Sequence, residues 1–156
     1  MKMLTNDTCP ITGLSGENAC ENCKEKLCEQ NLFACLIAGS RTFSNYKLLK
    51  EKMDHFLANK ENVLIISGGA RGADSLAEQY AHERKYKLLV MPAEWNKYGK
   101  SAGYKRNAKM HKALACFEDR GCVLFGDGKS KGTQHNIPLA ESNRTPVRIV
   151  RFDEEG

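Results

Sequence analysis

The chain has 156 residues, with 24 Lys and Arg against 19 Asp and Glu, which gives a formal net charge of +5. This length corresponds to one ordinary domain with at most a small appendage, and 41% hydrophobic residues suffice for a core, which excludes a globally disordered chain. No apolar run approaches the roughly 18 residues of a membrane-spanning helix, and the opening MKMLTNDTCPITG lacks the apolar centre of a secretory signal, so we expect a cytoplasmic location and no membrane partner.

The first part of the chain, residues 1–30, is polar and rich in cysteine, and we predict that it is separate from the domain at 31–156. Four of the seven cysteines of the chain lie here, with the spacing C-x10-C-x2-C-x4-C. They are Cys9, Cys20, Cys23 and Cys28. Four thiolates satisfy tetrahedral zinc, and a C-x2-C pair is a common chelating turn, so we predict a small knuckle around a structural zinc ion. An iron–sulfur centre and a tail of reduced thiols remain alternatives, whereas an odd number of cysteines argues against a disulfide framework.

From Leu32 onward, continuous apolar runs alternate with stripes at helical spacing. LFACLIAG at 32–39 predicts a strand that is buried on both faces, and the stripe that follows predicts a helix over 46–57. NVLIISGG at 62–69 predicts a second buried strand, followed by a helix over 73–81.

The same alternation continues to the end of the chain. The remaining predicted elements are a strand at 86–92, a helix at 102–117, a strand at 121–128, a short helix at 133–141 and a half-exposed edge strand at 146–152. Pro138 must lie in the first turn of that short helix or break it. Strands that alternate with helices imply right-handed crossovers, so we predict an α/β fold with a mostly parallel sheet and flanking helices.

Three of the predicted strands end in turns of glycine and other small residues: AGSR at 38–41, SGGARGAD at 67–74 and GDGKSKGT at 126–133. Parallel strands bring these turns to one edge of the sheet, where backbone N–H groups and helix N-termini can bind an anion such as phosphate. Arg41, Arg71, Lys129 and Lys131 add positive charge. Ordinary tight turns also use glycine, but three converging turns with these cations favour a phosphate-bearing ligand. The predicted lining residues are Gly39, Ser40, Arg41, Ser67, Gly68, Gly69, Arg71, Gly72, Asp74, Gly132 and Thr133.

None of these turns is a Walker loop or a GxGxxG fingerprint, which disfavours a standard nucleotide triphosphatase or nicotinamide dehydrogenase. Asp74 stands at the start of a predicted helix beside the second turn. It could accept a hydrogen bond from a ribose hydroxyl, or it could simply stabilise the first turn of the helix.

These segments, together with PAEWNKYGKSAGYKRNAKM at 92–110, resemble the YspA, cpYpsA-related SLOG family over about residues 33–141. The resemblance implies a Rossmann-like fold that binds a nucleotide or a nucleotide-derived, phosphoribosyl-containing ligand, as a sensor or processor of nucleotide signals. It also implies that Arg106 and Asn107 close the site. Related folds often pair through helices, so a homodimer is a further expectation.

The wider superfamily includes the LOG phosphoribohydrolases, which cleave the N-glycosidic bond of nucleoside monophosphates. Arg106 looks like their helix arginine, and Gly132-Thr133 looks like part of their Pro-Gly-Gly-x-Gly-Thr-x-x-Glu motif. The glutamate of that motif falls on Asn136, which cannot act as a carboxylate base. If the chain is an enzyme, we expect a nucleotide N-glycosidase with Arg106 and Asp74 as the catalytic candidates. Glu78, Glu94 and Asp127 are further carboxylates that could substitute.

The superfamily also includes the DNA-processing protein DprA, which makes single-stranded DNA the other candidate partner. Residues 97–112 contain six Lys or Arg and no Asp or Glu, and Trp95, Tyr98 and Tyr104 lie at or near them. Such a segment could stack bases and bind phosphates. It could equally be a solvated helix face, with Trp95 packed in the core.

Overall fold

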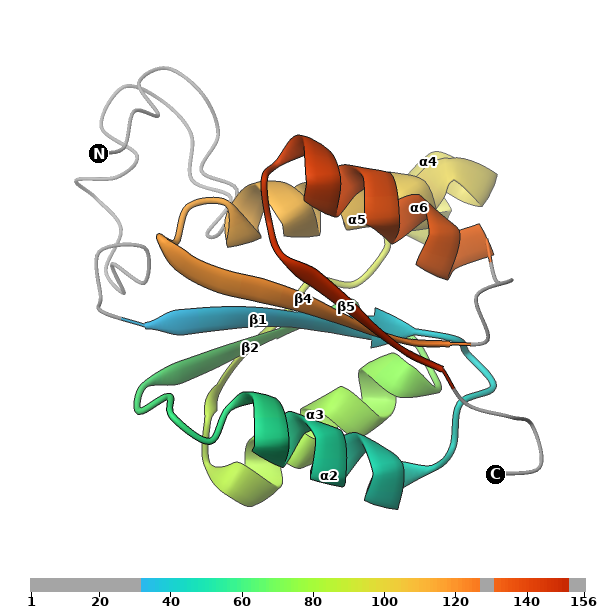
Figure 1. The fold of residues 1–156 in the computed structure, drawn as a ribbon. Coiled ribbons are helices and arrows are strands. Elements are labelled where there is room, and N and C mark those ends of the chain that lie inside the picture. Colours follow the sequence, from blue (N-terminus) through green and yellow to red (C-terminus); the bar gives the residue numbers. More distant parts are fainter. Residues whose placement is uncertain (1–31, 127–130, 152–156) are drawn as a thin grey trace.

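The computed structural model describes residues 32–126 and 131–151. Five strands form one sheet between two layers of helices (Figure 1). The strands are β1 (Phe33–Gly39), β2 (Val63–Ser67), β3 (Lys87–Val90), β4 (Asp119–Gly126) and β5 (Val147–Arg151). The helices are α2 (Tyr46–Phe56), α3 (Ala73–Arg84), α4 (Trp95–Tyr98), the 3-10 turn η2 (Gly99–Ser101), α5 (Ala102–Leu114) and α6 (Lys131–Ser142).

The two faces of β1 are covered by different helix layers, which explains its continuous apolar sequence. Leu36 belongs to the core cluster that contains Met110 and Leu114 of α5, whereas Ile37 belongs to the cluster that α2 and α3 complete. Successive side chains of a strand point to opposite faces, so a strand buried on both faces needs apolar residues at every position. The sequence of β1 meets that requirement.

The strand order is β3-β2-β1-β4-β5, and every neighbouring pair is parallel. This confirms the predicted α/β fold with a parallel sheet, and the order matches the first five strands of a Rossmann-type sheet. The chain moves outward from β1 to β3 and then crosses back to β4. The direction of winding therefore reverses between β1 and β4, and sheets of this kind bind ligands beyond the strand ends at such a point.

Several elements differ in their bounds from the sequence-based prediction; α3, for example, runs to Arg84 rather than to residue 81. Helix α5 ends at Leu114 rather than at residue 117, because the N–H groups of Cys116 and Phe117 bond to carbonyls three residues back, in tighter turns. The short α4 and η2 were not predicted, since they are too short to show a helical stripe. Strand β4 starts at Asp119, two residues before the predicted strand.

Helix α6 corrects the prediction for Pro138. The helix runs from Lys131 to Ser142, so the proline lies in its interior and neither in the first turn nor at a break. Proline removes one intrahelical hydrogen bond. Ile137 packs against the same core cluster as the buried Ala140, and this packing stabilises the helix through the proline.

The predicted cysteine knuckle with Cys9, Cys20, Cys23 and Cys28 lies outside the described residues. Within the described part of the chain, no three His, Cys, Asp or Glu side chains gather where they could hold a metal ion. Nor is any helix of that part long and apolar enough to cross a membrane.

Candidate functional site

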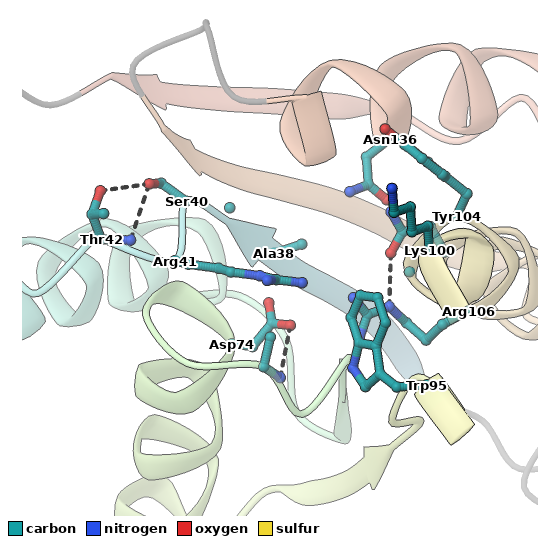
Figure 2. Close-up of a pocket in the computed structure, with 14 residues that line it drawn as sticks. Ala38, Ser40, Arg41, Thr42, Asp74, Trp95, Lys100, Tyr104, Arg106 and Asn136 are labelled. Atoms are coloured by element: carbon teal, nitrogen blue, oxygen red, sulfur yellow. Dashed lines mark hydrogen bonds between the residues drawn. The ribbon is translucent and has the colours of Figure 1, made fainter. Parts of the chain in front are cut away.

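A cavity of about 410 Å³ lies beyond the end of β1, at the point where the winding of the sheet reverses (Figure 2). We call it the α5 cavity, because α5 forms one wall. Its described lining residues come from β1 and the turn after it, from the loop before α3, and from α3, α4, η2, α5 and α6. They are Ala38, Gly39, Ser40, Arg41, Thr42, Ala70, Asp74, Trp95, Lys100, Gly103, Tyr104, Arg106, Asn107 and Asn136.

Arg41 and Trp95 are in contact at the wall of the α5 cavity. The Cζ atom of Arg41 lies 5.5 Å from the centroid of the indole ring, a cation–π contact. Figure 2 shows the Arg41 side chain reaching toward Trp95, with Asp74 beneath it. Trp95 is 48% exposed. The alternative that placed this tryptophan in the core is therefore wrong.

Arg106 is fixed in place by two hydrogen bonds. It donates from Nη1 to the carbonyl oxygen of Gly68, and from Nε to Oδ1 of Asn107 at 2.8 Å. A Cβ atom at position 68 would lie 2.5 Å from Nη1 of Arg106 and 2.8 Å from Oδ2 of Asp74. Glycine at position 68 therefore lets the guanidinium group approach the loop, which holds its charge at the cavity wall.

Asp74 is the one Asp or Glu among the described residues of the α5 cavity, and it is 5% exposed. Its Oδ2 accepts a hydrogen bond from the N–H of Ala70 at 3.2 Å. Burial raises the pKa of Asp74 to about 6, against the opposing effect of the Arg106 charge and the Ala70 N–H. At neutral pH the cavity therefore holds a carboxylate that is costly to keep ionised.

The turn after β1 is attached to the start of α3. The N–H of Ala73 donates to the carbonyl oxygen of Ser40 at 3.1 Å. Gly72 has a φ of +79°, and a Cβ atom there would lie 2.4 Å from that same oxygen, so glycine is required. The first N–H of α3 is thus used inside the protein. The positively charged side chains among the described lining residues are those of Arg41, Lys100 and Arg106.

Asn136 of α6 is held from behind by a buried histidine. The Nε2–H group of His111 donates to Oδ1 of Asn136 at 2.8 Å. Beside them, Nδ2 of Asn107 donates to Nδ1 of His135 at 3.4 Å, and the ring of Tyr104 meets His135 edge-on. Burial lowers the pKa of both histidines, so both rings are neutral near pH 7. This wall of the cavity is therefore polar but uncharged.

A second cavity, of about 380 Å³, adjoins the first. We call it the glycine-loop cavity. Its described lining consists of Arg41, Gly68, Gly69, Ala70, Arg71, Pro92, Ala93, Trp95 and Arg106. Arg41, Ala70, Trp95 and Arg106 line both cavities, so the Arg41–Trp95 pair lies at their common boundary.

Most of the predicted lining residues lie in these two cavities. Those in the α5 cavity are Gly39, Ser40, Arg41, Asp74, Arg106 and Asn107, and those in the glycine-loop cavity include Gly68, Gly69 and Arg71.

Ser67 and Gly72 line neither cavity. The Ser67 hydroxyl is buried, where it accepts from the N–H of Gly69 at 3.3 Å and lies 3.0 Å from the Glu78 carboxylate, so it supports the loop from behind.

Several other predicted residues add no described side chain to either cavity. Gly132 and Thr133 lie in the first turn of α6, where the structure describes the backbone alone. Asp127 and Lys129 lie outside the described residues. Glu94 precedes α4 and lines neither cavity.

The structure adds lining residues that the sequence did not assign to the site. They are Thr42, Ala70, Trp95, Lys100, Gly103, Tyr104, Asn136, Pro92 and Ala93. The aromatic residues near the basic segment were a signal for Trp95 and Tyr104. The aliphatic and small residues carried no such signal.

Comparisons with known proteins agree with this architecture. The model of the YspA, cpYpsA-related SLOG family matches residues 34–98, a shorter range than the resemblance expected over 33–141. The matched range contains β1 with its turn, the glycine loop and Trp95, whereas α5 and α6 lie beyond it.

Gene 61 protein of Mycobacterium phage D29 is 30% identical over 126 residues, which cover 77% of this chain and 96% of the phage protein. A solved structure of DNA processing protein A from Helicobacter pylori, described for its single-stranded DNA binding mode, is similar with a TM-score of 0.56. The likeness has 20% identity and covers 82% of this chain and 69% of that chain, so it shows a shared fold.

Proposed function

The chain belongs to the YspA, cpYpsA-related SLOG family, and from that premise we propose that it binds a nucleotide or a nucleotide-derived, phosphoribosyl-containing ligand at the cavities beyond β1. In this role the protein is a sensor or processor of nucleotide signals. The observation that carries the proposal is the convergence of Arg41 and Arg106 on a cavity at the reversal point of a parallel sheet.

The chemistry of the α5 cavity suits the parts of a nucleotide. Arg41, Lys100 and Arg106 can pair with phosphate oxygens, and a guanidinium group does so with two parallel hydrogen bonds. Trp95 and Tyr104 are 48% and 45% exposed, so their rings are accessible for stacking on a base. The Asp74 carboxylate can accept hydrogen bonds from ribose hydroxyls.

Trp95 is the single tryptophan of the chain, so its fluorescence reports directly on the site. We expect nucleoside monophosphates to change this fluorescence in a saturable way. Because a hydrogen bond to a charged group contributes about 1.5–3 kcal/mol, Arg41→Ala should weaken binding by about tenfold or more. The control is Lys47→Ala, which removes an equal charge from an exposed position in α2 and should leave the Kd unchanged. Equal Kd values for the two variants would contradict the proposal.

A nucleotide N-glycosidase is the alternative that Asp74 supports. Cleavage of a glycosidic bond generally uses a carboxyl group, and Asp74 is the described carboxylate of the α5 cavity, whereas Asn136 stands where the LOG motif has glutamate. In that reaction water adds to C1′ of the ribose and the base leaves with a proton. Release of free base from a nucleoside monophosphate, lost in Asp74→Asn, would favour this alternative over binding alone.

Single-stranded DNA is the alternative supported by the surface beside the cavity. Lys97, Lys105 and Lys109 each lie within 6.0 Å of the centroid of the Tyr98 ring, which makes a basic and aromatic patch on α4 and α5. A strand that crosses this patch would contact several phosphates, so its affinity would fall steeply with salt. The affinity of a mononucleotide would fall much less.

A further inference from the structure

A single nucleotide bound in the α5 cavity would leave the adjoining glycine-loop cavity empty. We propose that the ligand is a dinucleotide whose phosphate linkage lies at the boundary of the two cavities, with one nucleoside on each side of the Arg41–Trp95 pair. This inference rests on the proposed function and names the class of ligand.

The first step of the argument is the position of the shared cations. Arg41 and Arg106 line both cavities, and Arg106 is held there by the Gly68 carbonyl and by Asn107. An anionic group at the boundary can therefore pair with both guanidinium groups at once. The phosphate of a mononucleotide would occupy this place and leave the cavity on its other side unfilled.

The second step is that the two cavities are similar in size but differ in chemistry. Their volumes, about 410 and 380 Å³, each fall within the usual range for small-molecule sites. The α5 cavity offers aromatic rings, amides and the Asp74 carboxylate. The glycine-loop cavity offers the backbone of Gly68 and Gly69, the apolar surface of Pro92 and Ala93, and the cation of Arg71. None of its described lining residues is Asp or Glu, so no carboxylate there repels the phosphate linkage at the boundary.

The third step concerns how the linkage is held. In sheets with the GxGxxG fingerprint, a dinucleotide places its pyrophosphate on a helix N-terminus. Here the first N–H of α3 donates to the Ser40 carbonyl, and Gly72 packs beneath the Ser40–Arg41 backbone. The guanidinium groups of Arg41 and Arg106, which line both cavities, hold the linkage instead.

Titration calorimetry on the full chain tests this inference. The probes are the nucleoside monophosphate that the wild-type protein binds most tightly, the pyrophosphate-linked dinucleotide of the same nucleoside, and its phosphodiester-linked counterpart. We expect one of the two dinucleotides to bind at least about tenfold more tightly than the monophosphate. Which of them does so identifies the linkage.

Variants that alter one cavity show which cavity supplies the gain, meaning the extra affinity of the dinucleotide over the monophosphate. Arg71→Ala, which alters the glycine-loop cavity alone, should abolish the gain, so that the dinucleotide binds no more tightly than the monophosphate does. Ala93→Phe, which fills the same cavity, should act alike. Lys100→Ala, which alters the α5 cavity alone, should weaken both ligands, and Lys47→Ala should weaken neither.

Three results would overturn the inference. The first is equal affinity for the monophosphate and both dinucleotides, which would leave the proposed function standing. The second is a dinucleotide gain that survives both Arg71→Ala and Ala93→Phe. The third is an oligonucleotide of about ten residues that binds far more tightly than either dinucleotide, because the ligand would then be a strand. If no monophosphate and no dinucleotide binds at all, the proposed function fails as well.

Discussion

Asp74 shows how a single residue can connect folding to binding at this site. It is 5% exposed, and burial raises its pKa, whereas the positive charges of Arg106 and Arg41 lower it. Burial is the largest of these effects, and the pKa reaches about 6. The arginines therefore compensate for part of the cost of the buried charge.

This cost predicts a pH dependence of stability. The pKa of Asp74 is about 6 in the folded protein and 3.8 for an ordinary aspartate, so the folded state holds more protons between these values and the Asp74 contribution to stability falls as pH rises from about 4 to 6. The shift corresponds to about 3 kcal/mol. The free energy of unfolding of Asp74→Asn, measured with urea, should therefore increase relative to wild type as pH rises through this window, and stay level above it. A difference that does not change with pH would contradict the assignment.

The sequence predicts some residues of the site and not others. The turns after β1 and β2 could be predicted from their glycines; Arg41 and Arg71 lie in those turns, and Asp74 lies in the first turn of the following helix, α3. Trp95 could not be assigned, because an aromatic residue at that position is compatible with either a core or a surface. Its cation–π partner in the folded protein is Arg41, which lies over 50 positions earlier in the chain, so no local pattern around Trp95 indicates this contact.

At the scale of elements, α2 and α3 are joined by a polar contact outside the site. The Tyr80 hydroxyl donates to Oδ1 of Asp54 at 2.7 Å, and Arg84 donates to both oxygens of the same carboxylate. Tyr80 is fully buried, whereas the ion pair is partly exposed and contributes little by itself. The hydroxyl of Tyr80 is thus the part of this contact that is shielded from water.

This contact gives a matched pair of tyrosine variants. Tyr80→Phe removes one buried hydrogen bond and should lower the free energy of unfolding by about 1 kcal/mol. Tyr104→Phe makes the same change on an exposed ring at the α5 cavity and should leave stability unchanged. Chemical denaturation of both variants checks the prediction, and similar losses in the two would argue against a special role for the Asp54 contact.

The predictability of each element follows from its environment. The strands β1 and β2 and the part of β4 from Cys122 to Phe125 could be predicted, because helices cover both faces and the sequence there is almost entirely apolar. The polar start of β4, Asp119 and Arg120, gave no such signal. The position of Pro138 in helix α6 was predicted wrongly, because proline disfavours a helix interior locally while the packing of its neighbours favours the helix. The elements α4 and η2 lack any stripe, yet they carry Trp95 and lead to Lys100 at the cavity wall.

At the scale of the whole molecule, the parallel sheet determines where binding can occur. The alternation of strands and helices in the sequence predicts that the strands pair in parallel. It does not predict the strand order β3-β2-β1-β4-β5, in which a crossover brings β4 beside β1. That crossover places α5 and α6 opposite the turn after β1. The α5 cavity is therefore built from segments as distant as Ala38 and Asn136.

The net charge of +5 attracts any anion weakly to the molecule as a whole. A specific site must therefore distinguish its ligand from other anions by contacts in addition to charge.

The central claim is that the α5 cavity recognises a phosphate group on a nucleoside. Titration calorimetry of the full chain with each of the four common nucleoside monophosphates and with its parent nucleoside tests this most directly. At least one monophosphate should bind about tenfold or more tightly than its nucleoside, and Arg41→Ala should reduce that ratio while Lys47→Ala preserves it. If every nucleoside binds as well as its monophosphate, or if Arg41→Ala leaves the ratio unchanged, the claim is contradicted.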